Sequence, residues 1–311
     1  MLKILKRLWG RRNRLIDRIP DLKGKVLADE PLAKKNWLGV GGPAEVYVEP
    51  ADVMDLMRLM KAVPDEPLTI LGAGSNVLVL DGGVPGVTVR LGKNFAQIRV
   101  EGDRLICGAG ALLKDVARVA EKNNLSGFEF LSGIPGTVGG AVRMNAGAFG
   151  QSFGDRMVRL TSLMGNGNLS EIDTQKMAIF EYRRCYLPED WIFLEVALKG
   201  DRVTDPAVIR EKMLAYKKKR EESQPQGVRT AGSTFKNPDG LMAWKLIDKA
   251  GLRGFRVGGA VVSNKHANFL VNDKGASAKD IEALGEKIQR QIRQKYGVRL
   301  EWEIKKIGVR K

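Results

Sequence analysis

The sequence predicts a fold that mixes strands and helices in two or three domains, and three observations support this. The chain has 311 residues, which is long enough for more than one domain of ordinary size. Apolar residues alternate along some segments, as in half-buried strands, and recur at helical spacing along others. A glycine-rich turn joins two strand-like segments at a point where a dinucleotide-binding fold would begin a helix.

The composition is that of an ordinary soluble protein with an excess of positive charge. Hydrophobic residues make up 43% of the chain and charged residues 28%, and no apolar run is long enough to span a membrane. The formal net charge of +16 predicts attraction to anions. The anion could be nucleic acid, or a phosphorylated substrate together with a dinucleotide cofactor. Alternatively, the excess charge is simply solvated at the surface.

Cysteine and histidine are too scarce for several kinds of site. Cys107 and Cys185 have no metal-like spacing, so we expect a reducing cytoplasm and no metal centre. His266 is the single histidine, which argues against histidine-based triads and metal sites. Proton transfer must then fall to serine, tyrosine, lysine or a carboxylate.

Residues 1–25 are strongly basic and lack the long apolar core and cleavage site of a signal peptide. We expect a solvated helix here, and an amphipathic helix on anionic lipid is the alternative. The elements predicted next are a strand over Ala44–Glu49, a helix over Val53–Met60 that Asp52 caps, strands over Leu68–Leu71 and Leu78–Leu80, a strand over Arg99–Cys107, and a helix from Leu112 to Asn123.

The turn between the second and third strands has the sequence Gly72-Ala-Gly-Ser-Asn-Val77. A Rossmann fold requires a third glycine where this chain has Val77, so that fold is rejected. Consecutive N–H groups in such a turn can still bind an anion, while an ordinary hairpin turn is the alternative. If the turn binds phosphate, a side chain at Gly74 is expected to intrude between the ligand and these N–H groups.

The stretch Gly133–Gly150 is the densest in glycine, and we expect it to form a wall of a cofactor site. Arg143 and Asn145 are its only strongly polar side chains, so backbone N–H groups would supply most hydrogen bonds to a ligand. A flexible surface loop is the alternative, but the apolar residues within the stretch argue against it.

The character of the chain changes at Asp201, after which we expect a second functional region. The final segment alternates, with Leu300 and Trp302 on one face of a predicted strand and Glu301 and Glu303 on the other, so periodicity does not choose between the two glutamates. The remaining predictions are strands over Met157–Met164 and Trp191–Ala197, helices over Asp205–Glu222 and Ala243–Ala250, a linker over Ser223–Gly227, a capping box at Ser277–Asp280 and the buried helix face Ile281, Leu284, Ile288 and Ile292.

Seven motifs follow one another along the chain. They are Val40-Gly-Gly-Pro-Ala44, Gly72-Ala-Gly-Ser-Asn76, Gly133-Ile-Pro-Gly-Thr-Val-Gly-Gly140, Asn145-Ala-Gly-Ala-Phe-Gly150, Tyr182-Arg183, Gly232-Ser-Thr-Phe-Lys-Asn-Pro238 and Leu300-Glu-Trp-Glu303. Together and in this order they resemble the UDP-N-acetylenolpyruvoylglucosamine reductase family, FAD enzymes that make UDP-N-acetylmuramate for bacterial peptidoglycan. The resemblance spans about Asn36 to Gly308.

The resemblance implies an α+β fold. Residues 1–30 would be a basic segment, residues 31–201 a two-lobed FAD-binding domain of the vanillyl-alcohol-oxidase/PCMH type (lobes 31–92 and 93–201), and residues 202–311 an α+β substrate domain. The short spacing from Tyr182 to Ser233 resembles the type without an extra tyrosine-bearing loop. Trp302 stands where the family often has proline, and Cys185 where serine is common.

By the same resemblance, Arg183, Ser233 and Glu303 are the catalytic residues, and Glu303 is chosen over Glu301 on this ground alone. NADPH would reduce non-covalent FAD, hydride would pass to C3 of the enolpyruvyl ether, and Ser233 would protonate C2. Substrate would contact Tyr182, Arg229, Lys236 and Asn237. The flavin would contact Gly72, Ala73, Gly74, Ser75, Asn76, Val77, Gly133, Ile134, Pro135, Gly136, Thr137, Gly139, Gly140, Asn145, Ala146 and Gly147.

We therefore expect a cytoplasmic monomer that binds UDP-N-acetylglucosamine enolpyruvate and NADPH, with neither nucleic acid nor stable membrane insertion. Two alternatives are a flavin-dependent sugar or lactone oxidase and a basic nucleic-acid-binding protein. The first is weakened because no Arg-Ser-Gly-Gly-His stretch for covalent flavin is found. The second is weakened by an aromatic content of only 6%.

Overall fold

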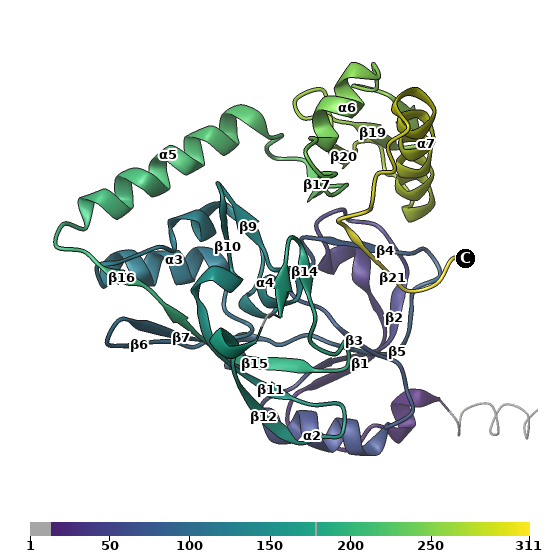
Figure 1. Cartoon of the computed structure of the whole chain (residues 1–311). Coiled ribbons are helices and arrows are strands. Elements are labelled where there is room, and N and C mark those ends of the chain that lie inside the picture. Colours follow the sequence, from purple (N-terminus) through teal and green to yellow (C-terminus); the bar gives the residue numbers. More distant parts are fainter. Residues whose placement is uncertain (1–13, 178) are drawn as a thin grey trace, which may run out of the picture.

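The computed structural model describes residues 14–177 and 179–311, and in this part the chain forms three sheets of four, five and four strands, with several two-stranded pairs and a long helix ahead of the third sheet (Figure 1). Of the basic helix expected over residues 1–25, residues 1–13 lie outside the described part. The rest of that segment contains only the 3-10 turn η1 (Leu15–Arg18) before the first strand begins at Lys25.

The first sheet contains two of the strands predicted near the N-terminus, β2 (Pro43–Glu49) and β3 (Leu68–Ile70), while the third, β4 (Val77–Val79), pairs outside it with the last strand of the chain. Helix α2 (Val53–Ala62) packs Leu56 and Leu59 into the core, and the Asp52 side chain accepts a hydrogen bond from Asp55 N, as the sequence predicts. In spatial order the strands are β1 (Lys25–Pro31), β2, β5 (Val84–Val89) and β3, with β4, η2 (Leu32–Lys35) and η3 (Lys93–Phe95) beside them.

The second sheet has five antiparallel strands. Residues 99–107 are a hairpin rather than the one long strand predicted, because Gly102 takes a φ of +61° and reverses the chain. The strands in spatial order are β12 (Leu169–Asp173), β11 (Met157–Leu163), β15 (Ile192–Lys199), β7 (Arg104–Gly108) and β6 (Ile98–Glu101).

Three helical segments pack against this second sheet and bury a shared apolar core. They are α3 (Leu113–Lys122), η4 (Glu129–Gly133) and α4 (Val138–Met144). The shorter elements around them are β8 (Leu125–Ser126) with β16 (Asp201–Arg202), β9 (Gly147–Ala148) with β10 (Gln151–Ser152), β13 (Phe180–Glu181) with β14 (Arg184–Cys185), η5 (Gly154–Arg156) and η6 (Thr174–Lys176).

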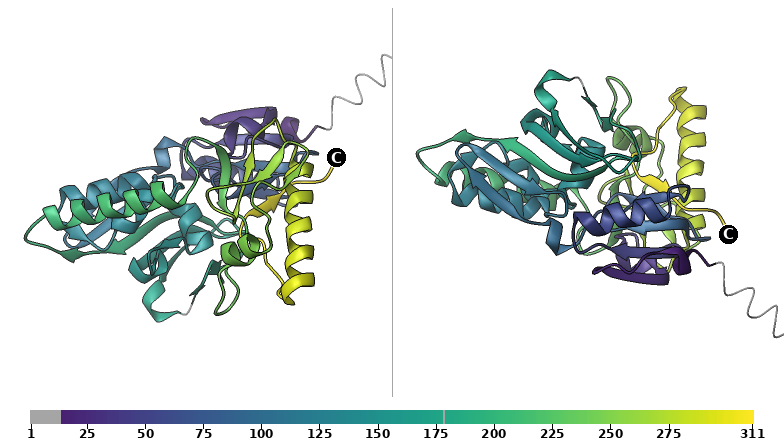
Figure 2. Two further views of the ribbon diagram at one scale, coloured as in Figure 1. Left: turned by 90° about the horizontal axis from the view of Figure 1, so that it is seen from above. Right: turned by 90° about the horizontal axis from the view of Figure 1, so that it is seen from below.

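Helix α5 (Ala207–Ser223), predicted over 205–222, runs along the second sheet's helices and leads to the third sheet (Figures 1 and 2). The helix α7 (Ala278–Tyr296) begins at the predicted capping box and buries the predicted apolar face. The remaining elements here are β17 (Arg229–Ser233), β20 (Phe269–Asn272), β19 (Ala260–Val262), β18 (Arg256–Val257) and α6 (Ala243–Lys249).

The final segment differs from the regular strand predicted over residues 298–305. Its alternation is present, because Leu300 and Ile304 are buried, but its backbone pairs only at a bridge between Phe235 and Trp302. The strand β21 (Lys305–Ile307) then pairs in parallel with β4 beside the first sheet. The end of the chain therefore returns to the first lobe, and Figure 1 shows this return beside β4.

The Trp302 ring packs against α7 at Gly285, where the helix has no side chain. A Cβ atom added at Gly285 would overlap the Trp302 indole ring, and that ring also lies tilted against Phe235, with centroids 5.3 Å apart.

We predict that Gly285→Ala lowers the free energy of unfolding by about 1–3 kcal/mol, because the added methyl overpacks this contact. Urea denaturation measures the change. Gly92→Ala is the control, since a Cβ atom there meets nothing within 4 Å. Equal stabilities of the two variants would contradict the prediction.

Candidate active site

The two glycine-rich segments face each other across the boundary between the two lobes. The turn that includes Gly72 connects β3 to β4, and the segment that begins at Gly133 leads into α4. The Ser75 hydroxyl donates to the Pro135 carbonyl over 2.8 Å, and a Cβ atom at Gly72 would lie 2.8 Å from Thr137 Oγ1. The predicted turn and the predicted wall are thus in direct contact.

Several backbone N–H groups of these segments are left without a protein acceptor in the described residues. Within residues 14–177 and 179–311, no acceptor bonds to the N–H groups of Gly72, Ala73, Gly74, Ser75, Asn76, Gly136 and Thr137. Five of them are consecutive, and successive free N–H groups form a concave anion-binding surface. These residues are mostly half-buried, and an anionic group such as a pyrophosphate fits the run of N–H groups that the protein leaves free.

Gly74 is required by protein packing rather than by ligand approach. Its φ is +70°, and an added Cβ atom would overlap the Lys35 carbonyl oxygen and Asn36 Cα. The expectation that a Gly74 side chain would intrude directly on a phosphate is therefore wrong. Gly74 lets the turn lie against the segment after η2, where Trp37 N donates to the Gly74 carbonyl over 2.9 Å.

The stretch Gly133–Gly150 is an ordered wall and not a flexible loop. Its helix α4 starts after Thr137, and Val138 and Val142 are buried in the second core. The guanidinium of Arg143 donates to the carbonyls of Leu187, Pro188 and Trp191. Its charge is thus used to hold the neighbouring loop, which leaves the backbone to meet a ligand.

Asn145 has a similar structural use. It ends α4 with a φ of +40°, its amide donates to the Glu181 carbonyl over 2.9 Å, and its side-chain oxygen accepts from Gly154 N over 2.9 Å. Sequence reasoning grouped Asn145 with the flavin contacts. The side-chain bonds seen here instead join the glycine-rich wall to the β13–β14 hairpin.

Arg183 lies at the tip of that hairpin and meets Glu303 from the opposite end of the chain. Arg183 Nε donates to Glu303 Oε1 over 2.8 Å, and a second guanidinium nitrogen donates to the Gly147 carbonyl over 2.8 Å. The φ of Arg183 is +55°, a backbone conformation that a non-glycine residue seldom takes. Such strain is concentrated at functional positions.

Geometry separates the two glutamates that periodicity could not. The Glu303 side chain is 13% exposed, whereas that of Glu301 is 69% exposed and pairs with Lys236 at 3.6 Å. Burial raises the pKa of the Glu303 carboxyl, and the neighbouring Arg183 guanidinium opposes that rise. Glu303 therefore protonates more readily than a solvated glutamate.

Ser233 ends β17 next to the backbone that carries Glu303. Gly232 before it takes a φ of +79°, and Thr234 after it accepts a hydrogen bond from Glu303 N over 2.8 Å. Asn76 Nδ2 donates to the Glu303 carbonyl over 3.2 Å. Residues from the first lobe, the second lobe and the C-terminal region thus meet around Glu303.

The four predicted substrate contacts have different surroundings in the structure. Tyr182 is exposed, with its ring centroid 5.1 Å from Arg183 Cζ. Arg229 places its Cδ and guanidinium over Gly39 of the first lobe. Lys236 faces Glu301, and the Asn237 side-chain oxygen accepts from Ala243 N over 3.0 Å and so caps α6.

Comparison with known proteins matches both parts of the chain. Residues 44–173 match the family model described as "FAD binding domain", and residues 224–307 match "UDP-N-acetylenolpyruvoylglucosamine reductase, C-terminal domain". UDP-N-acetylenolpyruvoylglucosamine reductase of Paramagnetospirillum magneticum is 50% identical over 95% of this chain and 96% of its own length. The Rhodospirillum rubrum protein of the same name is 50% identical over 95% of this chain and 94% of its own. This chain belongs to the UDP-N-acetylenolpyruvoylglucosamine reductase family.

A solved structure supports the same assignment. The crystal structure of the reductase of this name from Thermus caldophilus matches with a TM-score of 0.80 and 34% identity, over 93% of this chain and 100% of that one. The predicted α+β fold, with an FAD-binding domain ahead of the C-terminal domain, is confirmed. The family membership sets aside both the sugar oxidase and the nucleic-acid-binding alternatives. No helix in residues 14–177 and 179–311 is long and apolar enough to cross a membrane.

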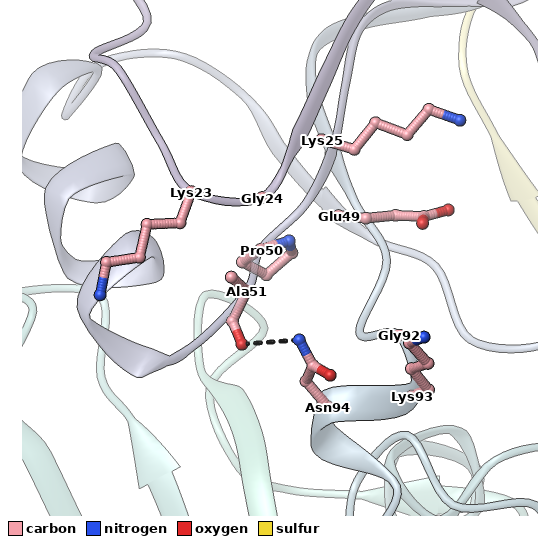
Figure 3. A pocket seen from close by; sticks show the side chains of 9 residues that line it. All are labelled: Lys23, Gly24, Lys25, Glu49, Pro50, Ala51, Gly92, Lys93 and Asn94. Carbon is pink, nitrogen blue, oxygen red and sulfur yellow. Dashed lines mark hydrogen bonds between the residues drawn. The ribbon is translucent and has the colours of Figure 1, made fainter.

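A separate cavity lies on the first lobe, between β1 and η3 (Figure 3). Asn94 Nδ2 donates to the Ala51 carbonyl across it over 3.1 Å, and Lys23 is paired with Asp52 at 3.3 Å. Its lining shares no residue with the glycine-rich segments. The lining residues are Lys23, Gly24, Lys25, Glu49, Pro50, Ala51, Gly92, Lys93 and Asn94.

We predict that Gly74→Ala lowers the affinity for FAD at least about tenfold. The clash with Lys35 displaces five adjacent N–H groups, and each of them contributes about 1 kcal/mol or more as a hydrogen bond to an anion. Flavin absorbance after gel filtration and titration of the apoprotein with FAD measure the loss. Gly102→Ala is the control, since its φ of +61° imposes a similar backbone cost in open space. Equal FAD affinities would show that the turn is not part of the flavin site.

Proposed function

We propose that this chain reduces UDP-N-acetylglucosamine enolpyruvate to UDP-N-acetylmuramate, using NADPH and FAD, with Arg183, Ser233 and Glu303 as its catalytic residues. The activity rests on family membership and serves peptidoglycan precursor synthesis. The observation that carries the residue roles is the buried Arg183–Glu303 pair, which is joined through the backbone to the segment that bears Ser233.

The flavin fits the two facing glycine-rich segments, whose free N–H groups suit its pyrophosphate. Bound FAD supplies hydride transfer between NADPH and the substrate. The residues of the chain then have three tasks, which are to orient the enolpyruvyl group, to stabilise charge that develops on its carboxylate, and to deliver a proton to C2.

Arg183 and Glu303 are suited to the second task. Hydride addition at C3 develops an enolate across C2 and the adjacent carboxylate. Arg183 supplies a positive charge in a fixed position. Burial raises the pKa of Glu303 and so favours its protonated form, which can donate a hydrogen bond. Donors held in place before the reaction stabilise such charge without reorganisation.

Ser233 is suited to the third task because it carries a hydroxyl and ends β17, and the next residue, Thr234, bonds through its backbone to Glu303. The single histidine, His266, is not required. Protonation at C2 from the serine hydroxyl completes the reduction, and the alkoxide that remains regains a proton from solvent.

The substrate carries a diphosphate and a carboxylate, and these anionic groups can bind the basic residues near the site. Arg229, Lys236, Tyr182 and Asn237 are proposed contacts, within a substrate domain over residues 202–311 that follows the FAD domain over 31–201. We further propose that the enzyme works as a monomer in the cytoplasm, where its nucleotide substrates are found. Gel filtration with light scattering tests the oligomeric state.

We predict that Ser233→Ala accepts hydride from NADPH normally but loses about 10²–10⁴ in the rate of flavin reoxidation by substrate, the usual value of a positioned general acid. Ser233→Cys keeps a transferable proton and should retain more activity. Stopped-flow flavin absorbance separates the two half-reactions, and in heavy water the wild type should place solvent deuterium at C2. A Ser233→Ala rate within about threefold of wild type would contradict this role.

We also predict a pH dependence for reoxidation. Because burial raises the pKa of Glu303, its protonated form persists to higher pH than that of a solvated glutamate. A rate that needs this form is full below the raised pKa and falls as pH rises through it. Glu303→Gln keeps an N–H donor that does not ionise, so its rate should not vary over this range. Glu301→Gln is the control and should keep the wild-type profile. A pH profile that Glu303→Gln leaves unchanged would rule out this titration.

A further inference from the structure

The last turns of α5 (labelled in Figure 1) contact both ends of the glycine-rich wall, at Gly133 through Arg220 and at Phe149 through Tyr216. Ile209, Tyr216 and Arg220 are spaced seven and four residues apart and so share one face of the helix. Ile209 is buried, and the ring of Tyr216 stacks on Phe149, with centroids 4.0 Å apart and planes 4° apart. This face of α5 therefore packs on the FAD-binding domain.

Arg220 packs on the other end of the wall, at Gly133. A Cβ atom added at Gly133 would lie 2.6 Å from Arg220 Cδ, so the absence of a side chain there makes room for the arginine. Gly133 stands three residues before Gly136, whose N–H group is among those without a protein acceptor.

Arg220 also differs from the other cations of α5, each of which is either paired with a carboxylate or, like Lys218 and Lys219, exposed to solvent. Arg210 pairs with Glu121 at 2.8 Å, Lys212 with Glu129 at 3.5 Å, and Lys217 with Glu221 at 3.8 Å. In the part of the chain that the structure describes, the Arg220 guanidinium has neither a carboxylate partner nor a hydrogen-bond acceptor. Burial lowers the pKa of Arg220, and no neighbouring acid opposes that effect.

An unpaired, partly buried cation is unfavourable until an anion joins it. The planar guanidinium matches phosphate oxygens in a bidentate arrangement, and it is well suited to a fixed site. The ligands proposed for this enzyme share one such group, the diphosphate, which occurs in FAD, in the UDP-sugar and in NADPH.

We propose that Arg220 is a ligand-binding residue that holds a nucleotide diphosphate against the wall that begins at Gly133. This inference rests on the proposed function for the identity of the nucleotides. Helix α5 then links the FAD-binding domain to the C-terminal region. Arg220 contacts the wall, and the carbonyl of the next helix residue, Glu221, accepts a hydrogen bond from Lys265 of the C-terminal region.

Three titrations identify which diphosphate is held. Apoprotein is titrated with FAD, and FAD-loaded protein is titrated with UDP and with NADP⁺, at one fixed ionic strength. We expect Arg220→Met to weaken one of the three affinities by about tenfold or more, as for the loss of a charge-assisted hydrogen bond. Arg220→Lys should recover part of the loss, since it restores the charge without the bidentate geometry.

Lys218→Met is the matched control, because it removes the same charge from an exposed position of the same helix. It should change each affinity by less than about twofold. Gly133→Ala is a second test that keeps the charge but displaces the Arg220 side chain, and it should weaken the same affinity as Arg220→Met. Far-ultraviolet circular dichroism and urea midpoints report on folding of every variant.

A loss confined to FAD identifies the flavin diphosphate, a loss confined to UDP identifies the substrate, and a loss confined to NADP⁺ identifies the reductant. If Arg220→Met and Lys218→Met bind all three ligands alike, the proposal is overturned. Wild-type protein that binds neither FAD nor UDP would instead overturn the proposed function, so the two failures are distinguishable.

Discussion

The return of the chain's last residues to the first lobe is the constraint on which the site depends. Strand β21 pairs with β4, and Lys305 N donates to the Asn76 carbonyl over 3.0 Å, so Glu303 is carried to the turn that faces the glycine-rich wall. The same segment bridges to Phe235 beside Ser233. One stretch of backbone thus sets the positions of two proposed catalytic residues relative to the flavin-binding lobes, and Trp302 locks it against α7.

The sequence predicted the elements well wherever local chemistry decides them. The Asp52 cap, the Ser277 capping box and the strand–turn–strand around Gly72 all follow from short-range hydrogen bonding and periodicity, and all are present. The hairpin within residues 98–108 was missed because its two strands were taken as one, although the pair Gly102-Asp103 between them is of a type that favours a two-residue hairpin turn.

The site was predictable only in part, because its contacts join residues far apart in sequence. Motif resemblance singled out Arg183, Ser233 and Glu303, but periodicity left Glu301 and Glu303 equivalent until tertiary packing buried one of them. Arg220 was missed entirely. It stands in a lysine-rich helix where charges usually face water, and its lack of a counter-ion is visible only once α5 is packed on Gly133.

Backbone strain concentrates where the wall meets the catalytic hairpin. Of the five non-glycine residues with positive φ in the described part of the chain, three are Asn145, Phe149 and Arg183. Such conformations cost of order 1–3 kcal/mol each and persist only when surrounding contacts determine them. Asn145 is held by two side-chain hydrogen bonds, Phe149 by its stack on Tyr216, and Arg183 by Glu303 and the Gly147 carbonyl. Because Glu303 comes from the far end of the chain, the conformation of Arg183 depends on tertiary contacts, and an arginine held in this way needs little rearrangement to meet a substrate carboxylate.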